Sequence, residues 1–358
     1  MNYEKYMQKC IELAKQAQGM TSPNPMVGCV VLDEKGFEIS TGYHKFCGAG
    51  HAEADALSKI DKGQGHTLIV NLEPCSHYGK TPPCADLIIE KEIKCVVIGM
   101  RDVNPIVAGN GIKKLKSAGI DVVEDVLNFE CKKLNEVFIK NMTEKKCFVA
   151  IKSATTLDGK IATYTGDSKW ITSQKAREQV QKIRNMYDAI MTTSSTVMKD
   201  NPMMNCRLDN GKNLIKVVID REMKTDFNSK IYSNPKEKVY LAIDDALSIV
   251  NELPSHIELI KCKVNNNKVD IEELLEKLYQ KGVMSVLVEA GGIFNGEIVQ
   301  KGLADKIYQF IAPKILADNT GKSAFDGDRK DFIKDTLNYR VESVEIFEPD
   351  VLITLGRL

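Results

Sequence analysis

Four residues in one stretch of the sequence have the types and the spacing of a catalytic zinc site. His51, Cys75 and Cys84 offer one imidazole and two thiolates, a donor set that suits Zn²⁺ and leaves a fourth tetrahedral position for water. Glu53 lies two residues after His51, so its carboxylate can reach that water and carry a proton to a leaving group. A structural site would normally be closed by a fourth protein ligand. The pattern therefore predicts a catalytic site.

A core histidine and two ordinary thiols are the simpler interpretation, because cysteine often packs as a small hydrophobic side chain. The zinc site is favoured because the His, the acidic residue and the junction of Pro74 and Cys75 all fall where such a mechanism needs them. The order H-x-E followed by P-C and a second Cys is that of zinc-dependent nucleobase deaminases, whose Glu is general acid/base and not a ligand. Eight residues separate Cys75 from Cys84, which points to one branch of that superfamily.

Residues 23–30, 50–53 and 73–84 closely resemble the deaminase half of the bifunctional riboflavin-biosynthesis deaminase/reductases. The resemblance implies a cytidine-deaminase-like, three-layer α/β domain, which we place at residues 1–144. Without the resemblance, most of the polar residues near the zinc segment would be turn formers or solvated side chains. With it, five of them are expected substrate contacts: Asn24, His44, Lys80, Asp102 and Asn104.

Residues 148–160 and 166–173 resemble the reductase half of the same family, in the family's order. The resemblance implies a dihydrofolate-reductase-like α/β domain at residues 145–358, after a charged link at 143–146. It implies a catalytic Lys152 and substrate contacts by Ser168, Arg184, Met204, Arg207 and Glu289. It implies NADPH contacts by Ala154, Trp170, Thr172, Thr196, Asp200, Gly291, Gly292, Ile293, Phe294, Asn295 and Gly296.

Physical arguments support some of these reductase residues. Helix N-termini bind phosphate, which favours Thr196, and a guanidinium can bind phosphate oxygens through two bonds, which favours Arg184 and Arg207. Paired glycines after a buried strand let backbone N–H groups approach a dinucleotide phosphate, although they could equally permit tight helix packing. Residues 204–206 and 293–295 depart from the family's more usual Leu/Thr and Pro-Thr-Leu patterns.

The elements that position these residues follow from apolar periodicity, capping residues and turn signals. Two helix starts, at His51 and Cys84, should converge with the end of a buried strand at one sheet edge. Helices are expected at residues 6–17, 128–142, 174–186 (capped by Ser173) and 270–281. Further helices should begin at residues 51, 84 and 194 and directly after the paired glycines. Strands are expected at residues 26–32, 67–72, 95–100, 188–193, 216–220, 238–243, 257–261, 285–288, 305–316 and 341–355. One further strand should end near residue 43, and another should begin at residue 148.

Composition bounds the remaining possibilities. A length of 358 residues suggests two domains, and 49 basic against 49 acidic residues argue against a general nucleic-acid or membrane binder but leave a small phosphorylated substrate open. Ten scattered Cys are typical of reduced thiols, and neither a signal peptide nor an apolar membrane span is visible. We therefore expect a cytoplasmic protein. A homo-oligomer, either dimer or tetramer, is a separate expectation that composition does not provide.

The resemblance implies two consecutive reactions. The first removes a ring amine as ammonia from the family's phosphoribosylated diaminopyrimidine, and the second uses NADPH to reduce its ribosyl group to ribityl. A deaminase acting on RNA would share the zinc motif but would not explain the second half of the chain. A structural zinc module joined to a nucleotide-sensing domain would need four protein ligands and would show no turnover.

Overall fold

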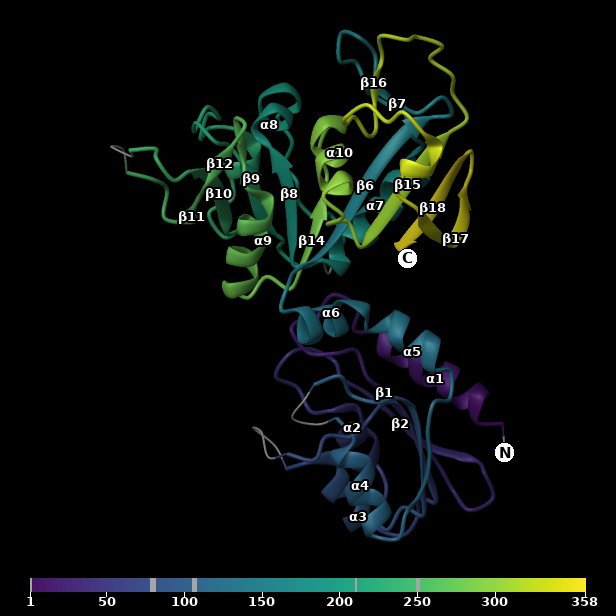
Figure 1. Cartoon of the computed structure of the whole chain (residues 1–358). Helices are drawn as coiled ribbons and strands as arrows, with labels where there is room; N and C mark the ends of the chain where they lie inside the picture. Colours follow the sequence, from purple (N-terminus) through teal and green to yellow (C-terminus); the bar gives the residue numbers. More distant parts are fainter. Residues whose placement is uncertain (1, 78–81, 105–107, 210, 249–251) are drawn as a thin grey trace. The chain divides into compact units, whose positions relative to one another are not determined.

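A computed structural model describes residues 2–77, 82–104, 108–209, 211–248 and 252–358, and it divides into two compact units (Figure 1). Unit 1 is Met1–Lys145 and unit 2 is Lys146–Leu358. Each unit has its own sheet and its own buried apolar cluster, so the expected two-domain α/β class is confirmed. Within the described residues, no helix combines the length and the apolar character that crossing a bilayer requires.

Unit 1 is built on a five-stranded sheet in the order β2-β1-β3-β4-β5. β1 is antiparallel to β2 and β3, whereas β3, β4 and β5 are parallel. Parallel strands bring their carboxyl ends to one edge, where ligands of open α/β sheets bind. The strands are β1 Gly28–Leu32, β2 Glu38–Tyr43, β3 Thr67–Leu72, β4 Cys95–Met100 and β5 Asp121–Val123.

Helices cover both faces of this sheet, as the three-layer expectation requires. α1 and α5 pack on one face and α2, α3 and α4 on the other (Figure 1). The helices are α1 Tyr3–Lys15, α2 Ala52–Leu57, α3 Cys84–Glu90, α4 Asn110–Ser117, α5 Asn128–Leu134 and α6 Glu136–Glu144.

A glycine in β2 allows α2 to lie close against the sheet. A Cβ at Gly42 would stand 2.4 Å from the carbonyl oxygen of Ala52 and 2.5 Å from the backbone nitrogen of Ala56. No real side chain fits such a gap, so only glycine permits this approach. α2 follows His51 and carries Glu53, so the glycine sets the depth at which both residues lie.

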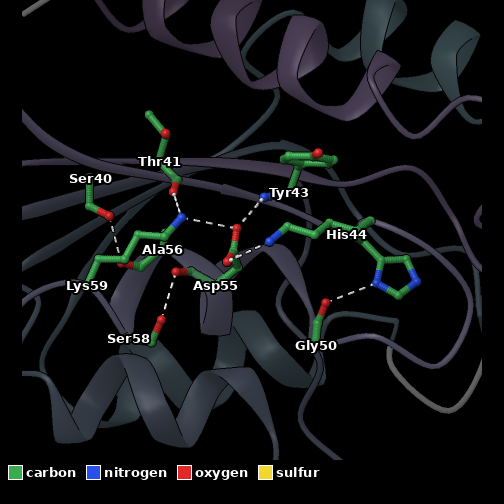
Figure 2. A network of polar contacts seen from close by, with 10 residues as sticks. Ser40, Thr41, Tyr43, His44, Gly50, Asp55, Ala56, Ser58 and Lys59 are labelled. Atoms are coloured by element: carbon green, nitrogen blue, oxygen red, sulfur yellow. Dashed lines mark hydrogen bonds and ion pairs between the residues drawn. The ribbon is translucent and has the colours of Figure 1, made fainter.

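Polar contacts fix α2 to β2 on the side of the helix that carries Asp55 (Figure 2). The Asp55 carboxylate accepts hydrogen bonds from the backbone N–H of Tyr43 (3.3 Å) and from the Lys59 ammonium (3.2 Å). Lys59 also donates to the carbonyl oxygen of Thr41 in β2 (2.7 Å). The helix therefore cannot rotate about its axis without breaking these bonds, which hold the orientation of the first turn that carries Glu53.

Unit 2 contains a nine-stranded sheet in the order β11-β10-β9-β8-β14-β6-β15-β18-β17. The strands from β11 to β15 are parallel, and the last two pairings are antiparallel. These strands are β6 Phe148–Thr156, β8 Ala189–Thr193, β9 Ile215–Ile219, β10 Val239–Asp244, β11 Ile257–Cys262, β14 Ser285–Val288, β15 Lys306–Ala312, β17 Tyr339–Phe347 and β18 Asp350–Arg357. Two short ribbons pair β7 Lys160–Ala162 with β16 Lys322–Ser323, and β12 Val264–Asn265 with β13 Lys268–Val269.

Alternate residues of the parallel strands supply two separate apolar clusters, one on each face of the sheet. In β8, Met191 belongs to the cluster beneath α9 and α10, whereas Ile190 belongs to the cluster that includes Val197 of α8. This alternation is the period of two that strand geometry imposes. The helices are α7 Gln174–Met186, α8 Ser194–Asp200, α9 Ile271–Gln280 and α10 Gly292–Gln300, with 3₁₀ turns at Lys230–Tyr232 and Ile333–Asp335.

Two elements that were each predicted as one continuous segment are divided into two in the structure. The single helix expected at 128–142 is broken between α5 and α6 at Asn135, whose side chain accepts from the Met26 N–H (2.8 Å) and donates to the Met26 carbonyl (3.0 Å). The single strand expected at 341–355 is the hairpin of β17 and β18, which turns at Glu348 and Pro349. Proline has no N–H to donate to the ladder, which favours a turn there.

Candidate zinc and reductase sites

His51, Cys75 and Cys84 come together from three elements at the edge of the unit 1 sheet. Their ligand atoms all lie within 4.8 Å of one another, with His51 Nδ1 3.5 Å from Cys75 Sγ and 3.3 Å from Cys84 Sγ. His51 is the N-cap of α2, Cys84 is the first residue of α3, and Cys75 follows β3. Among the described residues no fourth His, Cys, Asp or Glu joins this group. One imidazole and two thiols fit an open catalytic zinc site.

The protonation of the group also suits a cation. The hydrogen bond with Cys84 and the one with His51 lower the pKa of the Cys75 thiol to about 4, against the effect of burial. The bond with Cys75 raises the pKa of Cys84 and also the pKa of His51. A thiolate is the form of cysteine that binds a metal, so Cys75 is ready for one at neutral pH.

Glu53 and two of the three ligand residues, His51 and Cys75, line a cavity of about 210 Å³. The Glu53 side chain is buried, and burial, followed by the charge of Cys75, raises the pKa of its carboxyl to about 7. A general acid/base works best with a pKa near the working pH. The cavity is lined by Asn24, Pro25, Val27, His44, His51, Glu53, Leu72, Glu73, Cys75, His77, Asp102, Asn104 and Phe138. The structure thus gathers four of the five predicted substrate contacts with the zinc group, and the fifth, Lys80, lies outside the described residues.

His44 and Asn24 form one wall of this cavity in a fixed arrangement. His44 Nδ1 donates to the carbonyl oxygen of Gly50 (3.1 Å, Figure 2), so its Nε2 is free to accept from the Asn24 amide (3.2 Å). Burial lowers the pKa of His44, which keeps the ring neutral. The ring stands edge-on to that of His51, with 5.9 Å between centroids. The wall therefore presents neutral hydrogen-bonding groups beside the metal ligands.

Asp102 and Asn104 follow β4, on the neighbouring strand. Asp102 Oδ1 accepts from the backbone N–H of Asn104 (2.8 Å), and burial raises the pKa of Asp102 to about 6. Sequence reasoning missed Glu73, which lines the same cavity and accepts the backbone N–H of Asp102 (3.2 Å). Its only sequence signal is an acidic residue at the carboxyl end of a buried strand, beside a metal ligand.

The predicted reductase residues gather mostly around a second cavity, of about 540 Å³, in unit 2. Ten of them line it: Lys152, Ala154, Ser168, Trp170, Thr172, Thr196, Asp200, Met204, Glu289 and Gly291. This volume lies in the range of ordinary cofactor and ligand sites. The residues come from β6, the segment before α7, α8 and the end of β14, which are far apart in the sequence.

A buried carboxylate organises one side of this cavity. Glu289 receives two bonds from Arg184, Nε to Oε1 (2.6 Å) and Nη2 to Oε2 (3.0 Å), and Lys152 Nζ lies 3.8 Å from its Oε2. Burial tends to raise the pKa of Glu289, but the charges of Arg184 and Lys152 outweigh it and lower the pKa to about 2. The Arg184 fork is thus occupied within the protein, and neither Arg184 nor the exposed Arg207 lines the cavity.

Of the glycine segment, Gly291 alone lines this cavity. A Cβ at Gly292 would stand 2.2 Å from the carbonyl oxygen of Ser323, and one at Gly296 would stand 1.6 Å from that of Asp326. Both glycines therefore permit close packing of α10 against the 323–326 segment, and their contact with NADPH stays a prediction. The same holds for the other three residues outside the lining, Ile293, Phe294 and Asn295.

Sequence reasoning also missed cations that line the reductase cavity. Arg177 stacks over the Trp170 ring at 4.3 Å from its centroid and donates to the Thr172 carbonyl (2.7 Å). Lys199 and Lys322 add to Arg177 and Lys152, giving four cations against the carboxylates of Asp200 and Glu289. A lining with this excess of positive charge suits phosphorylated ligands. Lys199 is an exposed lysine of α8, and such a residue carries no local signal of this role.

Comparisons with known proteins match each half of the chain to a known domain. Residues 1–100 match the cytidine and deoxycytidylate deaminase zinc-binding region, and residues 147–353 match the RibD C-terminal domain. The riboflavin biosynthesis protein RibD of Actinobacillus pleuropneumoniae is 39% identical over 352 residues, which are 97% of this chain and 93% of the relative.

Two solved structures agree over nearly the full length. The diaminohydroxyphosphoribosylaminopyrimidine deaminase/5-amino-6-(5-phosphoribosylamino)uracil reductase of Thermotoga maritima is 40% identical with a TM-score of 0.87, covering 99% of both chains. RibD of Acinetobacter baumannii, in its form 1, is 32% identical with a TM-score of 0.87 and the same coverage. The zinc-ligand group lies within the first matched domain and the larger cavity within the second. The chain therefore belongs to the RibD family of riboflavin-biosynthesis enzymes, which join a zinc-binding pyrimidine deaminase to a reductase that uses NAD(P)H.

Proposed function

We propose that the two cavities act in sequence on the substrate for which the Thermotoga relative is named, diaminohydroxyphosphoribosylaminopyrimidine. Unit 1 removes a ring amine as ammonia, and unit 2 reduces the ribosyl group of the product to ribityl with NADPH. The observation that carries the proposal is the buried carboxyl of Glu53, which shares a cavity with His51 and Cys75 of the group that these two form with Cys84. This set matches what hydrolytic deamination of a base requires.

In the first reaction the chain supplies proton transfer and orientation. A zinc ion held by His51, Cys75 and Cys84 would activate water for attack at neutral pH. Glu53 accepts a proton from the attacking water and gives it to the ring nitrogen. It then takes the second proton from the hydroxyl now bonded to the ring carbon and gives it to the amine, which leaves as ammonia while the carbonyl forms. Four side chains that line the cavity, those of Asn24, His44, Asp102 and Asn104, hold the ring by its polar edges.

In the second reaction the chain orients the sugar and balances its charge. A nicotinamide held near Ala154, Trp170 and Thr196 would supply hydride to the sugar carbon attached to nitrogen. Lys152 and Glu289 both line the cavity, with Lys152 Nζ 3.8 Å from Glu289 Oε2. The Lys152 ammonium can therefore hold the sugar while its ring opens and hydride is transferred. Arg177, Lys199 and Lys322 supply charge for phosphate groups, which favours NADPH as the cofactor.

An assay of the full chain that follows ammonia and NADPH together tests this function. Ammonia should appear without NADPH, whereas NADPH oxidation should require prior deamination. Parallel reactions with single-stranded RNA and with NADH test the other base-deaminase function and the cofactor choice. Ammonia release from RNA but not from the nucleotide would overturn the proposal.

Lys152→Met should lower reductase turnover by about 10²–10³-fold, the usual cost of removing one group that stabilises developing charge. Ammonia release should stay unchanged, because Lys152 lies in unit 2. NADPH affinity should stay unchanged, because the Lys152 ammonium pairs with Glu289, an expected substrate contact. Steady-state NADPH oxidation with the deaminated intermediate measures reductase turnover, and fluorescence titration measures NADPH affinity.

Lys306→Met is the matched control for Lys152→Met. Lys306 is also a buried lysine paired with a glutamate, Glu342 (3.1 Å), but it does not line the cavity. Its replacement should lower stability and leave turnover per folded enzyme unchanged. Equal turnover in both variants would remove Lys152 from the substrate contacts.

We also propose that the protein is a cytoplasmic homo-oligomer. The support for an oligomer is β17, an edge strand of the nine-stranded sheet that exposes Val341, Val344 and Ile346. Apolar, unpaired strand edges are normally covered in stable proteins. Light scattering of the purified chain should give a mass above that of a monomer, and Val344→Lys should lower it. A monomeric mass would contradict the proposal.

A further inference from the structure

Glu73 occupies a junction between the two segments that build the unit 1 cavity. It follows the last residue of β3 and precedes Cys75 by two positions, and its side chain is only 3% exposed. Its backbone N–H donates to the carbonyl oxygen of Met100 at the end of β4 (2.9 Å). Glu73 thus lies where the zinc-ligand segment and the segment that carries Asp102 leave neighbouring strands.

The Glu73 carboxylate accepts three backbone N–H groups from the second segment. Oε2 accepts from Asp102 (3.2 Å) and Gly109 (3.0 Å), and Oε1 accepts from Ile112 (3.2 Å). In the described part of the chain no cationic side chain pairs with it. Gly109 is the N-cap of α4 and Ile112 belongs to its first turn, so the carboxylate satisfies helix N–H groups that have no partner within the helix.

The start of α4 is pressed against the same junction. A Cβ at Gly111 would stand 2.1 Å from the carbonyl oxygen of Pro74 and 3.2 Å from Glu73 Oε1. The helix therefore cannot move toward the ligand segment, and the carboxylate keeps it from moving away. Hydrogen bonds to an ionised acceptor are roughly twice as strong as neutral ones, which suits a fixed spacer between two parts of a site.

We propose that Glu73 is a positioning residue for the deaminase. It sets the distance between Asp102 and the zinc-ligand segment, and this distance determines where the pyrimidine ring binds. The inference rests on the proposed function, because it takes Asp102 as a substrate contact. Glu73 acts through the backbone of Asp102, since both of its oxygens are engaged by N–H groups.

Glu73→Gln in the full chain tests the inference. The amide keeps the shape but replaces one acceptor oxygen by a donor, so at least one of the three N–H groups loses its partner. The KM for the aminopyrimidine in ammonia release should rise about 10- to 100-fold, as for one or two lost bonds to a charged group. Zinc content and reductase turnover should stay unchanged. Glu73→Asp, which keeps the charge but shortens the reach, should raise KM less.

A double variant separates positioning from general stability. If Glu73 acts through Asp102, adding Glu73→Gln to Asp102→Asn should change KM by no more than about twofold, because the two residues form one unit. Glu124→Gln is the matched control, because Glu124 binds Arg101 (2.8 Å) and Lys116 (2.9 Å) and does not line the cavity. The KM of this variant for the aminopyrimidine should equal that of the native chain.

The outcomes are distinct. A raised KM in Asp102→Asn with an unchanged KM in both Glu73 variants, multiplicative effects in the double variant, or loss of zinc from Glu73→Gln would each overturn the inference alone. An unchanged KM in Asp102→Asn would overturn the proposed substrate contact and this inference with it. If Glu73→Gln does not fold, Glu73→Asp decides by the same criteria.

Discussion

Replacing Cys75 with serine should remove zinc from the protein and abolish ammonia release together. A serine hydroxyl stays protonated at neutral pH and is a poor zinc ligand, whereas the hydrogen bonds that Cys75 makes with Cys84 and His51 lower the pKa of its thiol to about 4. Elemental analysis should find about one zinc per native chain and far less in the variant. Supplied with the deaminated intermediate, the variant should still oxidise NADPH, because the reductase cavity lies in unit 2.

Cys95→Ser is the control for this loss. Cys95 is a buried cysteine of the same unit, but its thiol lies by the Tyr3 hydroxyl (3.9 Å) and not in the zinc group. This variant should retain both zinc and ammonia release. Full zinc content in Cys75→Ser would remove Cys75 from the ligand set.

Elements that depend on local sequence could be predicted closely. β3 has the predicted bounds, Thr67–Leu72, because it is an unbroken run that is buried on both faces. α7 begins after Ser173, as predicted, because the Ser173 hydroxyl accepts the N–H of Ala176 (3.3 Å). In both cases residues within one turn or one strand determine the outcome.

Features that depend on distant partners could not be predicted. Asn135 interrupts a helical apolar pattern because its amide binds Met26, 109 residues earlier. The substrate contact of Arg184 stays a prediction, but its pairing with Glu289, 105 residues later, had no local signal. The role of Glu73 is also invisible locally, since its three N–H donors lie 29 to 39 residues away. The zinc group was predictable because metal chemistry restricts the residue types at all three positions.

Glu53→Gln should slow deamination by about 10²–10⁴-fold, the usual contribution of a positioned general acid/base. Glutamine has nearly the same shape, so α2 and the zinc group should be preserved, but an amide cannot take up and release the proton that moves from water to the amine. Ammonia release under saturating substrate measures the rate, and elemental analysis of the same sample should show full zinc content. Near-normal ammonia release would exclude Glu53 as the proton carrier.

Asp55→Asn separates this chemical role from that of helix geometry. Asp55 lies in the same helix, two residues further on, but it contacts Tyr43 of β2 and Lys59, which follows α2 (Figure 2). It does not line the cavity. Its replacement weakens the contacts that orient α2 while leaving the Glu53 carboxyl in place. We expect lower stability with ammonia release within about threefold of native, since exposed or half-exposed ion pairs contribute only about 0–1 kcal/mol. Equal losses of activity in the two variants would mean that the position of α2, and not proton transfer by Glu53, limits the reaction.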